Sequence, residues 1–342
     1  MTGRALRWAL ACLLYWSGAL PLARALRRAG PPSVVILRYH RVLNERTGGR
    51  FYRLGIRDEI FRSGIRYLAR HYEILDLETA VRRLQEPASP GAAARGVSVV
   101  VTFDDGYADN DAPLRWLREQ GIPATVFVVS GPIDARRPFF WERLALLFEK
   151  MPSLASAPEG ERRRRFDDAR ARVKRMPHAE REAELSRLAA QAGVAGPAIE
   201  SQDDLPLTWD EVRALARAGV RFGGHTDTHP LLTCCTDEDV RREIACGNER
   251  LAAEAKLPVA SFAYPTGDVD RRVRDLTAAS GVAIALTCAP GRNRPGADPL
   301  MLRRKGVGEL VSEGPRGGFS RALWAAEIEG VFDALRALKR AG

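Results

Sequence analysis

The sequence predicts an α/β protein built on a parallel sheet, and three observations lead to this class. Apolar, β-branched runs alternate with segments of helical periodicity along most of the chain. A strand, a helix and a second strand follow one another over 97–129, the spacing of a parallel βαβ unit. The strand runs are apolar throughout, which is typical of strands buried on both faces. Two architectures remain open, a parallel barrel and a doubly wound sheet.

The elements keep this alternating order along the chain. The first strand follows Gly30-Pro31-Pro32 and ends near Tyr39-His40. Asp109, Asn110 and Asp111 are candidates to cap the helix that ends before Gly121. The other expected strands are 72–77, 97–103, 124–129, 220–224, 259–264, 282–288 and an edge strand at 301–307. The other expected helices are 60–72, 78–84, 209–219, 237–255, 271–281 and 319–340.

The chain divides into three parts. Residues 1–32 are an apolar and basic N-terminal segment, 33–310 form the α/β domain, and 311–342 form a C-terminal helix. The α/β rhythm is interrupted at about 135–205, where both signs of charge mix in helix-compatible sequence. We interpret this stretch as a helical insertion. Its arginine run could contact an acidic ligand, but a solvated helix face with ion pairs one turn apart is the simpler interpretation.

Composition limits the partners of the protein. Of its 342 residues, 45% are hydrophobic and 28% are charged, which argues against a disordered chain and against a multi-span membrane protein. The net charge of +10 suits an anionic membrane surface or an acidic polymer, whereas no nucleic-acid partner is expected.

The N-terminal segment predicts membrane association. Its apolar stretch from Trp8 to Ala23 is shorter than the roughly 20 residues of a comfortable span and is followed by arginines. A signal anchor, a cleaved signal peptide and a helix lying in the membrane interface all fit this pattern. The periplasmic and the cytoplasmic face of the membrane are both compatible with it.

Ionisable side chains follow two of the expected strands. Asp104 and Asp105 end the strand that begins at 97, and His225 and His229 come directly after the strand at 220–224. Since Pro230 disfavours a helical backbone at His229, we expect the histidines on a loop or tight turn. Each pair alone could be structural, as a loop cap or as hydrogen-bonded surface histidines. At matching strand ends, however, the two pairs should meet at one edge of the sheet.

A divalent metal would explain this combination. Two adjacent carboxylates at the end of an apolar strand are costly without a nearby cation. Two imidazoles and one carboxylate supply the three ligands of a catalytic zinc site and leave positions for water and substrate. The second carboxylate is then free to act as a base. We therefore expect a divalent metal ion, Zn²⁺ first, with Co²⁺, Ni²⁺ or Fe²⁺ as alternatives.

Three motifs carry a resemblance to a known family. The stretches TFDDGY (102–107), HTDTHP (225–230) and FAYPTGD (262–268) resemble, in this order, the first three motifs of the polysaccharide deacetylases, carbohydrate esterase family four. The similarity extends from Val34 to about Val307, includes Tyr39-His40, and is greatest to the bacterial branch linked to exopolysaccharide synthesis. The resemblance implies a distorted (β/α) barrel that removes acetyl groups from N-acetylated sugars.

The resemblance also implies residue roles. It makes Asp104 the catalytic base and assigns the metal to Asp105, His225 and His229. It further implies that the backbone N–H of Tyr264 helps to hold the oxyanion. The residues expected to contact the substrate are Tyr107, Pro265 and Arg303.

The chain departs from the family pattern at two positions. Ala263 stands where an arginine is common, and Cys288 stands where the motif Leu-x-His has its histidine. The biofilm-polysaccharide deacetylases, which the chain resembles in Tyr39-His40, point to His40 as the general acid. For the missing arginine, Arg303 and Arg304 are both candidates by position. Thr266 replaces an aromatic residue in the wall that faces the sugar.

We therefore expect a metal-dependent deacetylase of an N-acetylhexosamine-containing polysaccharide or its lipid-linked precursor. Two alternatives remain at this stage. The same site could hydrolyse a non-sugar amide, or the chain could be a catalytically silent glycan-binding protein, as the two departures would allow.

Overall fold

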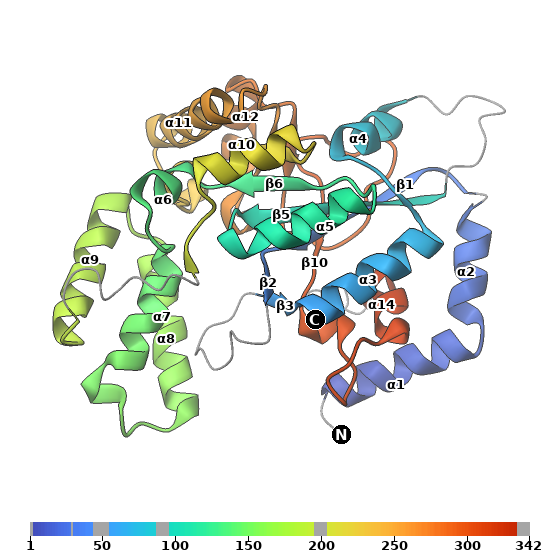
Figure 1. Cartoon of the computed structure of the whole chain (residues 1–342), viewed down its shortest axis with the longest axis horizontal. Coiled ribbons are helices and arrows are strands. Elements are labelled where there is room, and N and C mark those ends of the chain that lie inside the picture. Colours follow the sequence, from blue (N-terminus) through green and yellow to red (C-terminus); the bar gives the residue numbers. More distant parts are fainter. Residues whose placement is uncertain (1–2, 29, 44–54, 87–95, 195–203, 334–342) are drawn as a thin grey trace.

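Parallel strands form the centre of the molecule (Figure 1), whose computed structural model describes residues 3–28, 30–43, 55–86, 96–194 and 204–333. An eight-stranded sheet has the order β10-β1-β5-β6-β7-β8-β9, with β4 beside β5. A parallel bridge between Leu286 and Leu302 brings the two ends of the sheet together. The sheet is thus a nearly closed barrel, which confirms the expected distorted (β/α) barrel. Its strands are β1 (Ser33–Tyr39), β4 (Glu73–Ile74), β5 (Val97–Asp105), β6 (Thr125–Val128), β7 (Arg221–Gly224), β8 (Ser261–Ala263), β9 (Ile284–Leu286) and β10 (Arg304–Gly306).

The strand register brings the functional loops together. Asp104 and Asp105 pair with Phe127 and Val128 of β6, and Val128 pairs with Gly224 at the end of β7. Because these strands are parallel and in step, the chain leaves β5 and β7 at the same edge of the barrel. A separate short pair, β2 (Arg41–Leu43) and β3 (Gly55–Arg57), lies beside the end of β1.

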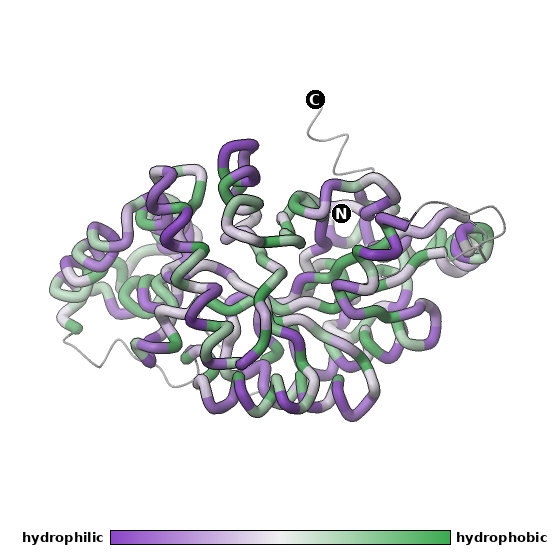
Figure 2. The backbone as a smooth tube through the Cα atoms, turned by 90° about the horizontal axis from the view of Figure 1, so that it is seen from above, coloured by the Kyte–Doolittle hydropathy of each residue, from purple (hydrophilic) through white to green (hydrophobic). Residues whose placement is uncertain are grey.

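Amphipathic helices cover the sheet, and hydrophobic and hydrophilic residues alternate along them (Figure 2). Local signals fix several of their starts. Thr208 and Glu211 form a capping box at α10, and the side chains of Asp76, Thr236 and Asp270 cap α4, α11 and α12. At α5, by contrast, Asn110 is the N-cap residue without a capping side-chain bond. These helices are α3 (Asp58–His71), α4 (Leu77–Gln85), α5 (Asp111–Glu119), α6 (Ser130–Ala135), α10 (Trp209–Arg217), α11 (Asp237–Ala255) and α12 (Arg271–Ala279).

Three helices between β6 and β7 form a lobe beside the barrel (Figure 1): α7 (Phe140–Lys150), α8 (Glu159–Val173) and α9 (His178–Gln191). The lobe has its own apolar core, which includes Phe148, Phe166 and Leu185. Buried Arg41 of β2 ties it to the barrel, because its guanidinium donates to Asp204 at 2.7 Å and lies 3.5 Å from Glu142 of α7. The lobe therefore has a fixed position over the carboxyl edge of the sheet.

The N-terminal helices α1 (Gly3–Trp16) and α2 (Ala19–Arg28) lie on the side of the barrel away from this lobe (Figure 1). Helix α1 packs on α14 (Arg321–Ile328), which follows the short helix α13 (Glu309–Ser312). One continuous helix was expected over 319–340. In the structure α14 ends at Ile328, and Gly330 follows with a φ of +80°, a conformation that ends helices. Residues 334–342 of this expected helix, and 195–203 of the expected insertion, lie outside the described residues.

Candidate metal centre and active site

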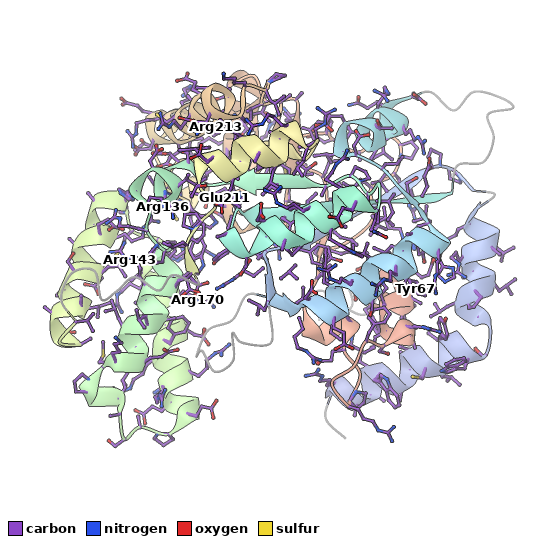
Figure 3. All side chains as sticks on the ribbon, in the orientation of Figure 1. Tyr67, Arg136, Arg143, Arg170, Glu211 and Arg213 are labelled. Carbon is purple, nitrogen blue, oxygen red and sulfur yellow. The ribbon has the colours of Figure 1, made fainter. Side chains whose placement is uncertain are left out.

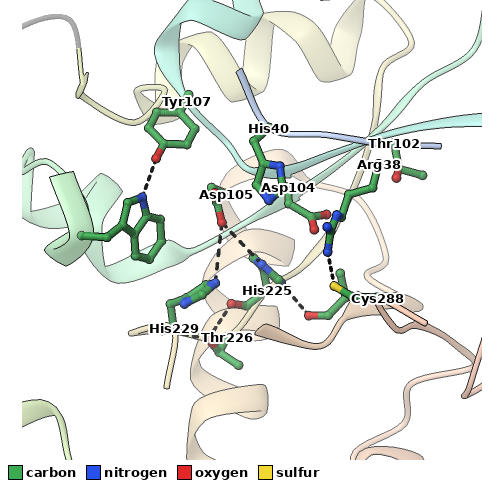
Figure 4. Close-up of polar contacts among 12 residues, drawn as sticks. Arg38, His40, Thr102, Asp104, Asp105, Tyr107, His225, Thr226, His229 and Cys288 are labelled. Carbon is green, nitrogen blue, oxygen red and sulfur yellow. Dashed lines mark hydrogen bonds and ion pairs between the residues drawn. The ribbon is translucent and has the colours of Figure 1, made fainter. Parts of the chain in front are cut away.

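Asp105, His225 and His229 converge at the carboxyl edge of the barrel (Figure 4). The Nε2 atoms of His225 and His229 lie 3.5 and 3.7 Å from Oδ1 of Asp105. One donor atom from each of the three side chains lies within 4.8 Å of the other two, and all three side chains are buried. A single small cation could contact all three donors.

The protonation and orientation of these groups fit a metal. His225 Nδ1–H donates to the carbonyl oxygen of Ala263 at 2.6 Å, so its Nε2 faces Asp105 as a free acceptor. Burial lowers the pKa of His229 to about 3, which keeps this imidazole neutral. Burial alone would raise the pKa of Asp105, but the histidines around it lower it, so it stays ionised. Two imidazoles and a carboxylate are the donor set of catalytic zinc.

The backbone around the candidate ligands is strained, and helix α11 holds the loop that carries the histidines. Asp105, Thr226 and His229 have φ of +73°, +70° and +57°, values that non-glycine residues seldom adopt and that cluster at functional sites. Buried Glu243 of α11 accepts hydrogen bonds from the backbone N–H of Asp227 at 3.1 Å and of Thr228 at 2.8 Å. Its other oxygen accepts from the Thr228 hydroxyl at 2.7 Å. The loop expected after the strand at 220–224 is confirmed, and Glu243 holds its shape.

Asp104 has a different partner from its neighbour. The fully buried guanidinium of Arg304 in β10 donates to both oxygens of Asp104, at 2.6 and 2.8 Å, and to the carbonyl of Thr287 at 2.9 Å. Burial alone would raise the pKa of Asp104, but Arg304 holds it well below its usual range. Asp104 is therefore an ionised, rigidly held carboxylate beside the Asp105 group.

A cavity of about 270 Å³ opens onto these groups. Asp104, Asp105, His225 and His229 line its base. One wall belongs to the barrel and the other to the lobe. The barrel residues are Arg38, His40, Thr266 and Cys288, and the lobe residues are Phe140, Trp141, Arg170 and Lys174.

His40 reaches this cavity from the end of β1, on the barrel wall. Burial lowers its pKa to about 4, although the charge of Asp105 acts in the opposite direction. Cys288, which stands where the resembling family has a histidine, lies on the same wall, and its sulfur accepts a hydrogen bond from Arg38 (Figure 4). The cavity thus contains one titratable imidazole besides the two of the candidate metal group.

The expectation for Tyr264 is wrong. Its backbone N–H donates to the carbonyl of Leu286 at 3.0 Å, within the β8–β9 pairing, so it is not available to an oxyanion. Its hydroxyl donates to the carbonyl of Leu300 at 3.1 Å, and the ring is buried. From the same turn, Thr266 lines the cavity, with a φ of +58°.

The three residues expected to contact the substrate do not line the cavity. The Tyr107 hydroxyl is buried. It donates to Glu142 at 2.8 Å and accepts from Trp141 at 2.7 Å, so it positions Trp141, which lines the cavity. Pro265 is buried in the turn before Thr266. Arg303, directly before β10, is exposed and donates to the carbonyl of Pro290, whereas its neighbour Arg304 is buried. Of the two arginine candidates, Arg304 contacts Asp104.

Several site residues carried no local signal in the sequence. Glu243 lies in the middle of an ordinary amphipathic helix, and Trp141 lies in the insertion. Arg170 and Lys174 belong to the charged run that favoured a solvated helix face. That interpretation holds for Arg165, which pairs with Glu161 one turn away. Arg170 also pairs within the helix, with Asp167, but it and Lys174 line the cavity as well.

Comparison with known proteins agrees with this fold and these motifs. Residues 92–285, more than half of the chain, match the sequence model of the polysaccharide deacetylase family. No curated protein sequence matches the chain. IcaB from Ammonifex degensii is 19% identical with a TM-score of 0.56, covering 86% of this chain and 99% of IcaB. The Streptococcus pyogenes deacetylase PplD, in complex with acetate, is 17% identical with a TM-score of 0.54, covering 81% and 93%.

A third solved structure has the same fold. The BpsB deacetylase domain from Bordetella bronchiseptica is 17% identical with a TM-score of 0.51, covering 80% of this chain and 96% of that domain. At these identities the solved structures establish the shared barrel, and the family match establishes the class. The chain belongs to the polysaccharide deacetylase family, and it is a hydrolase of amide bonds.

Proposed function

We propose that the protein is a metal-dependent deacetylase that hydrolyses the N-acetyl group of an N-acetylhexosamine unit in a polysaccharide or its precursor. The observation that carries this proposal is the pairing of two unlike carboxylates. Asp105 lies in a three-donor group with His225 and His229, and Asp104 beside it is held by Arg304. One cavity gives a substrate access to both.

Asp105, His225 and His229 would hold the ion, with Zn²⁺ the best fit to two imidazoles and one carboxylate. A bound divalent ion supplies Lewis acidity, lowering the pKa of water towards about 7 and polarising the acetamide carbonyl. The remaining chemistry belongs to side chains of the chain itself.

Two residues move the proton. Asp104, ionised and fixed by Arg304, takes a proton from the attacking water as the water oxygen bonds to the carbonyl carbon. His40, on the cavity wall, gives a proton to the nitrogen as the C–N bond breaks, and acetate and the amino sugar leave. Because the pKa of His40 is lowered to about 4, the imidazole is neutral near pH 7. It therefore has to gain its proton during the reaction, and the balance closes when the proton that Asp104 takes from water passes through the cavity to His40 and from there to the leaving nitrogen.

The test combines metal content with product analysis. The zinc-loaded protein should release acetate and free amine in equal amounts from N-acetylglucosamine oligomers, and chelation should abolish the release until Zn²⁺ is restored. Asp104→Asn should lose activity while keeping its metal, whereas His225→Ala should lose both. Full activity in Asp104→Asn would contradict the mechanism. Turnover of small non-sugar amides alone would support the alternative substrate class, and no turnover of any amide would support a silent glycan-binding protein.

We also propose that the N-terminal helices hold the protein on a membrane surface. Leu13, Trp16 and Leu26 of α1 and α2 are 67%, 77% and 68% exposed. The opposite face of α1 is docked on the body, where Ala11 is buried and Arg7 donates to Glu327 at 2.6 Å. Among the described residues, no single helix passes for a membrane span, but α1 and α2 together do as a pair bent by 66°. An apolar outer face flanked by arginines suits an interfacial position.

A further inference from the structure

The lobe contributes cations to the cavity wall. Arg170 (Figure 3) and Lys174 lie one turn apart at the carboxyl end of α8, and both line the cavity that contains the Asp105 group. On the barrel side, Arg38 lines the same cavity. Three positive side chains thus surround the entrance to a site whose expected reacting group, an acetamide, is neutral.

Two of these cations have no carboxylate partner among the residues that the structure describes. Lys174 is partly buried and makes no ion pair there, and burial together with the charge of Arg170 lowers its pKa. The Nε–H of Arg38 is buried without an acceptor, and the Cys288 sulfur is the acceptor of its Nη1. Arg170, by contrast, donates to Asp167 at 3.2 Å. The charge of Asp268 also acts on Lys174, but it does not cancel the lowering of the Lys174 pKa, so Lys174 is a cation without an ion-pair partner among the described residues.

The carboxylates at the base of the cavity do not balance these charges. Asp104 is already neutralised by its two hydrogen bonds from Arg304. Asp105 belongs to the donor group of a divalent ion, whose charge it only partly offsets. With the metal bound, the cavity is therefore strongly positive, and desolvated cations without a counter-charge are costly unless a ligand supplies one.

We propose that the substrate carries an anionic oxygen group, a phosphate ester or a carboxylate, on or next to its acetamido sugar, and that Lys174 and Arg38 bind this group. Arg170 adds positive charge on the same wall. This inference rests on the proposed deacetylase function and narrows its substrate class from acetamido sugars in general to anionic ones. Phe140 and Trp141, whose ring centroids lie 6.5 and 4.7 Å from that of His229, offer an apolar surface for the sugar ring.

The phosphate and the carboxylate can be distinguished with three substrates. The first is a neutral N-acetylglucosamine oligomer, the second is N-acetylglucosamine carrying a phosphate or diphosphate ester at its anomeric oxygen, and the third is an oligosaccharide alternating N-acetylglucosamine with a uronic acid. We expect kcat/KM of the zinc-loaded, full-length protein to be at least about tenfold higher on one anionic substrate than on the neutral one. The preferred anion identifies the source of the charge.

Variants of Lys174 test the contact directly. Lys174→Met should lower kcat/KM on the preferred anionic substrate by about tenfold to a hundredfold, mainly through KM, and change it less than about twofold on the neutral oligomer. Lys174→Arg should restore much of the loss. The matched control is Lys150→Met, which removes the same charge from an exposed position at the end of α7 and should behave as wild type.

A binding measurement separates this inference from the proposed function. Calorimetry on zinc-loaded wild type and Lys174→Met with glucosamine 1-phosphate, which cannot be deacetylated, should show the same loss of affinity that the kinetics show. Equal binding and equal kinetics in Lys174→Met and Lys150→Met, or a preference for the neutral oligomer, would overturn the anionic-substrate inference while acetate release still supported the deacetylase. No acetate from any of the three substrates would instead refute the proposed function.

Discussion

Arg304 determines what Asp104 can do. The pair is buried and bidentate, so removing the cation leaves Asp104 in a cavity without its main counter-charge. If Asp104 is the base, Arg304→Met should lower kcat by about tenfold to a hundredfold, because the carboxylate loses its fixed position and is already protonated over more of the pH range. Without Arg304, burial raises the pKa of Asp104. The acid limb of the pH–activity profile should therefore shift to higher pH in this variant.

The control for this prediction is the adjacent residue. Arg303→Met removes an exposed cation that does not line the cavity and should keep wild-type kcat. Steady-state kinetics measure kcat of both variants, at a temperature where circular dichroism shows each variant to be folded. Wild-type kcat in Arg304→Met would mean that the ion pair serves only the fold.

His40 can be tested by changing the leaving group. If His40 protonates the departing nitrogen, His40→Asn should slow amide hydrolysis by about 10²- to 10⁴-fold. The same variant should lose only a few-fold on an aryl acetate, whose phenolate leaves without a proton. His71→Asn, at the end of α3 and outside the cavity, is the matched control. Equal losses on the amide and the aryl ester would assign His40 a structural role.

At the level of elements, α11 determines the shape of the loop from His225 to His229. Glu243 accepts from two backbone N–H groups and one hydroxyl of that loop. Glu243→Gln replaces one of its acceptor oxygens with a donor, so the strained loop should relax and weaken zinc binding by about tenfold to a hundredfold. Competition with a chelator measures this affinity. Glu249→Gln, exposed on the same helix, should bind zinc as wild type does, and equal affinity in both variants would contradict the prediction.

Elements that form through local interactions could be predicted from the sequence, and features that depend on long-range packing could not. The strand at 97–103 and the helix at 237–255 could be predicted because their signals are local, in β-branched runs and in helical periodicity. The convergence of Asp105 with the histidines was also predicted, since parallel strands share an edge. Glu243 and Lys174 were not, because their roles depend on how α11 and α8 pack in three dimensions. The expected role of Tyr264 failed because strand pairing with β9 uses its amide.

At the scale of the whole molecule, exposed apolar side chains are concentrated at one end. Six of the seven large hydrophobic side chains found exposed among the described residues lie on α1 and α2, and the seventh is Met301. Residues 1–44 contain no Asp or Glu, and three of their arginines, Arg4, Arg7 and Arg27, pair with glutamates of the C-terminal part. The proposed contact with an anionic bilayer would bury these apolar side chains in the membrane interface. The lobe and its cavity wall lie on the other side of the barrel (Figure 1), so membrane contact through α1 and α2 leaves the lobe uncovered.

The membrane proposal predicts a specific loss of binding. Replacing Leu13 and Trp16 with serine should reduce affinity for phosphatidylglycerol vesicles by at least about tenfold, because two exposed apolar side chains no longer enter the interface. Neither residue is buried, so unfolding temperature and zinc-dependent activity on a soluble substrate should stay near wild type. Met301→Ser removes an exposed apolar side chain elsewhere and should bind vesicles normally. Vesicle co-sedimentation measures the effect, and equal binding of wild type and the double variant would show that this apolar face has another partner.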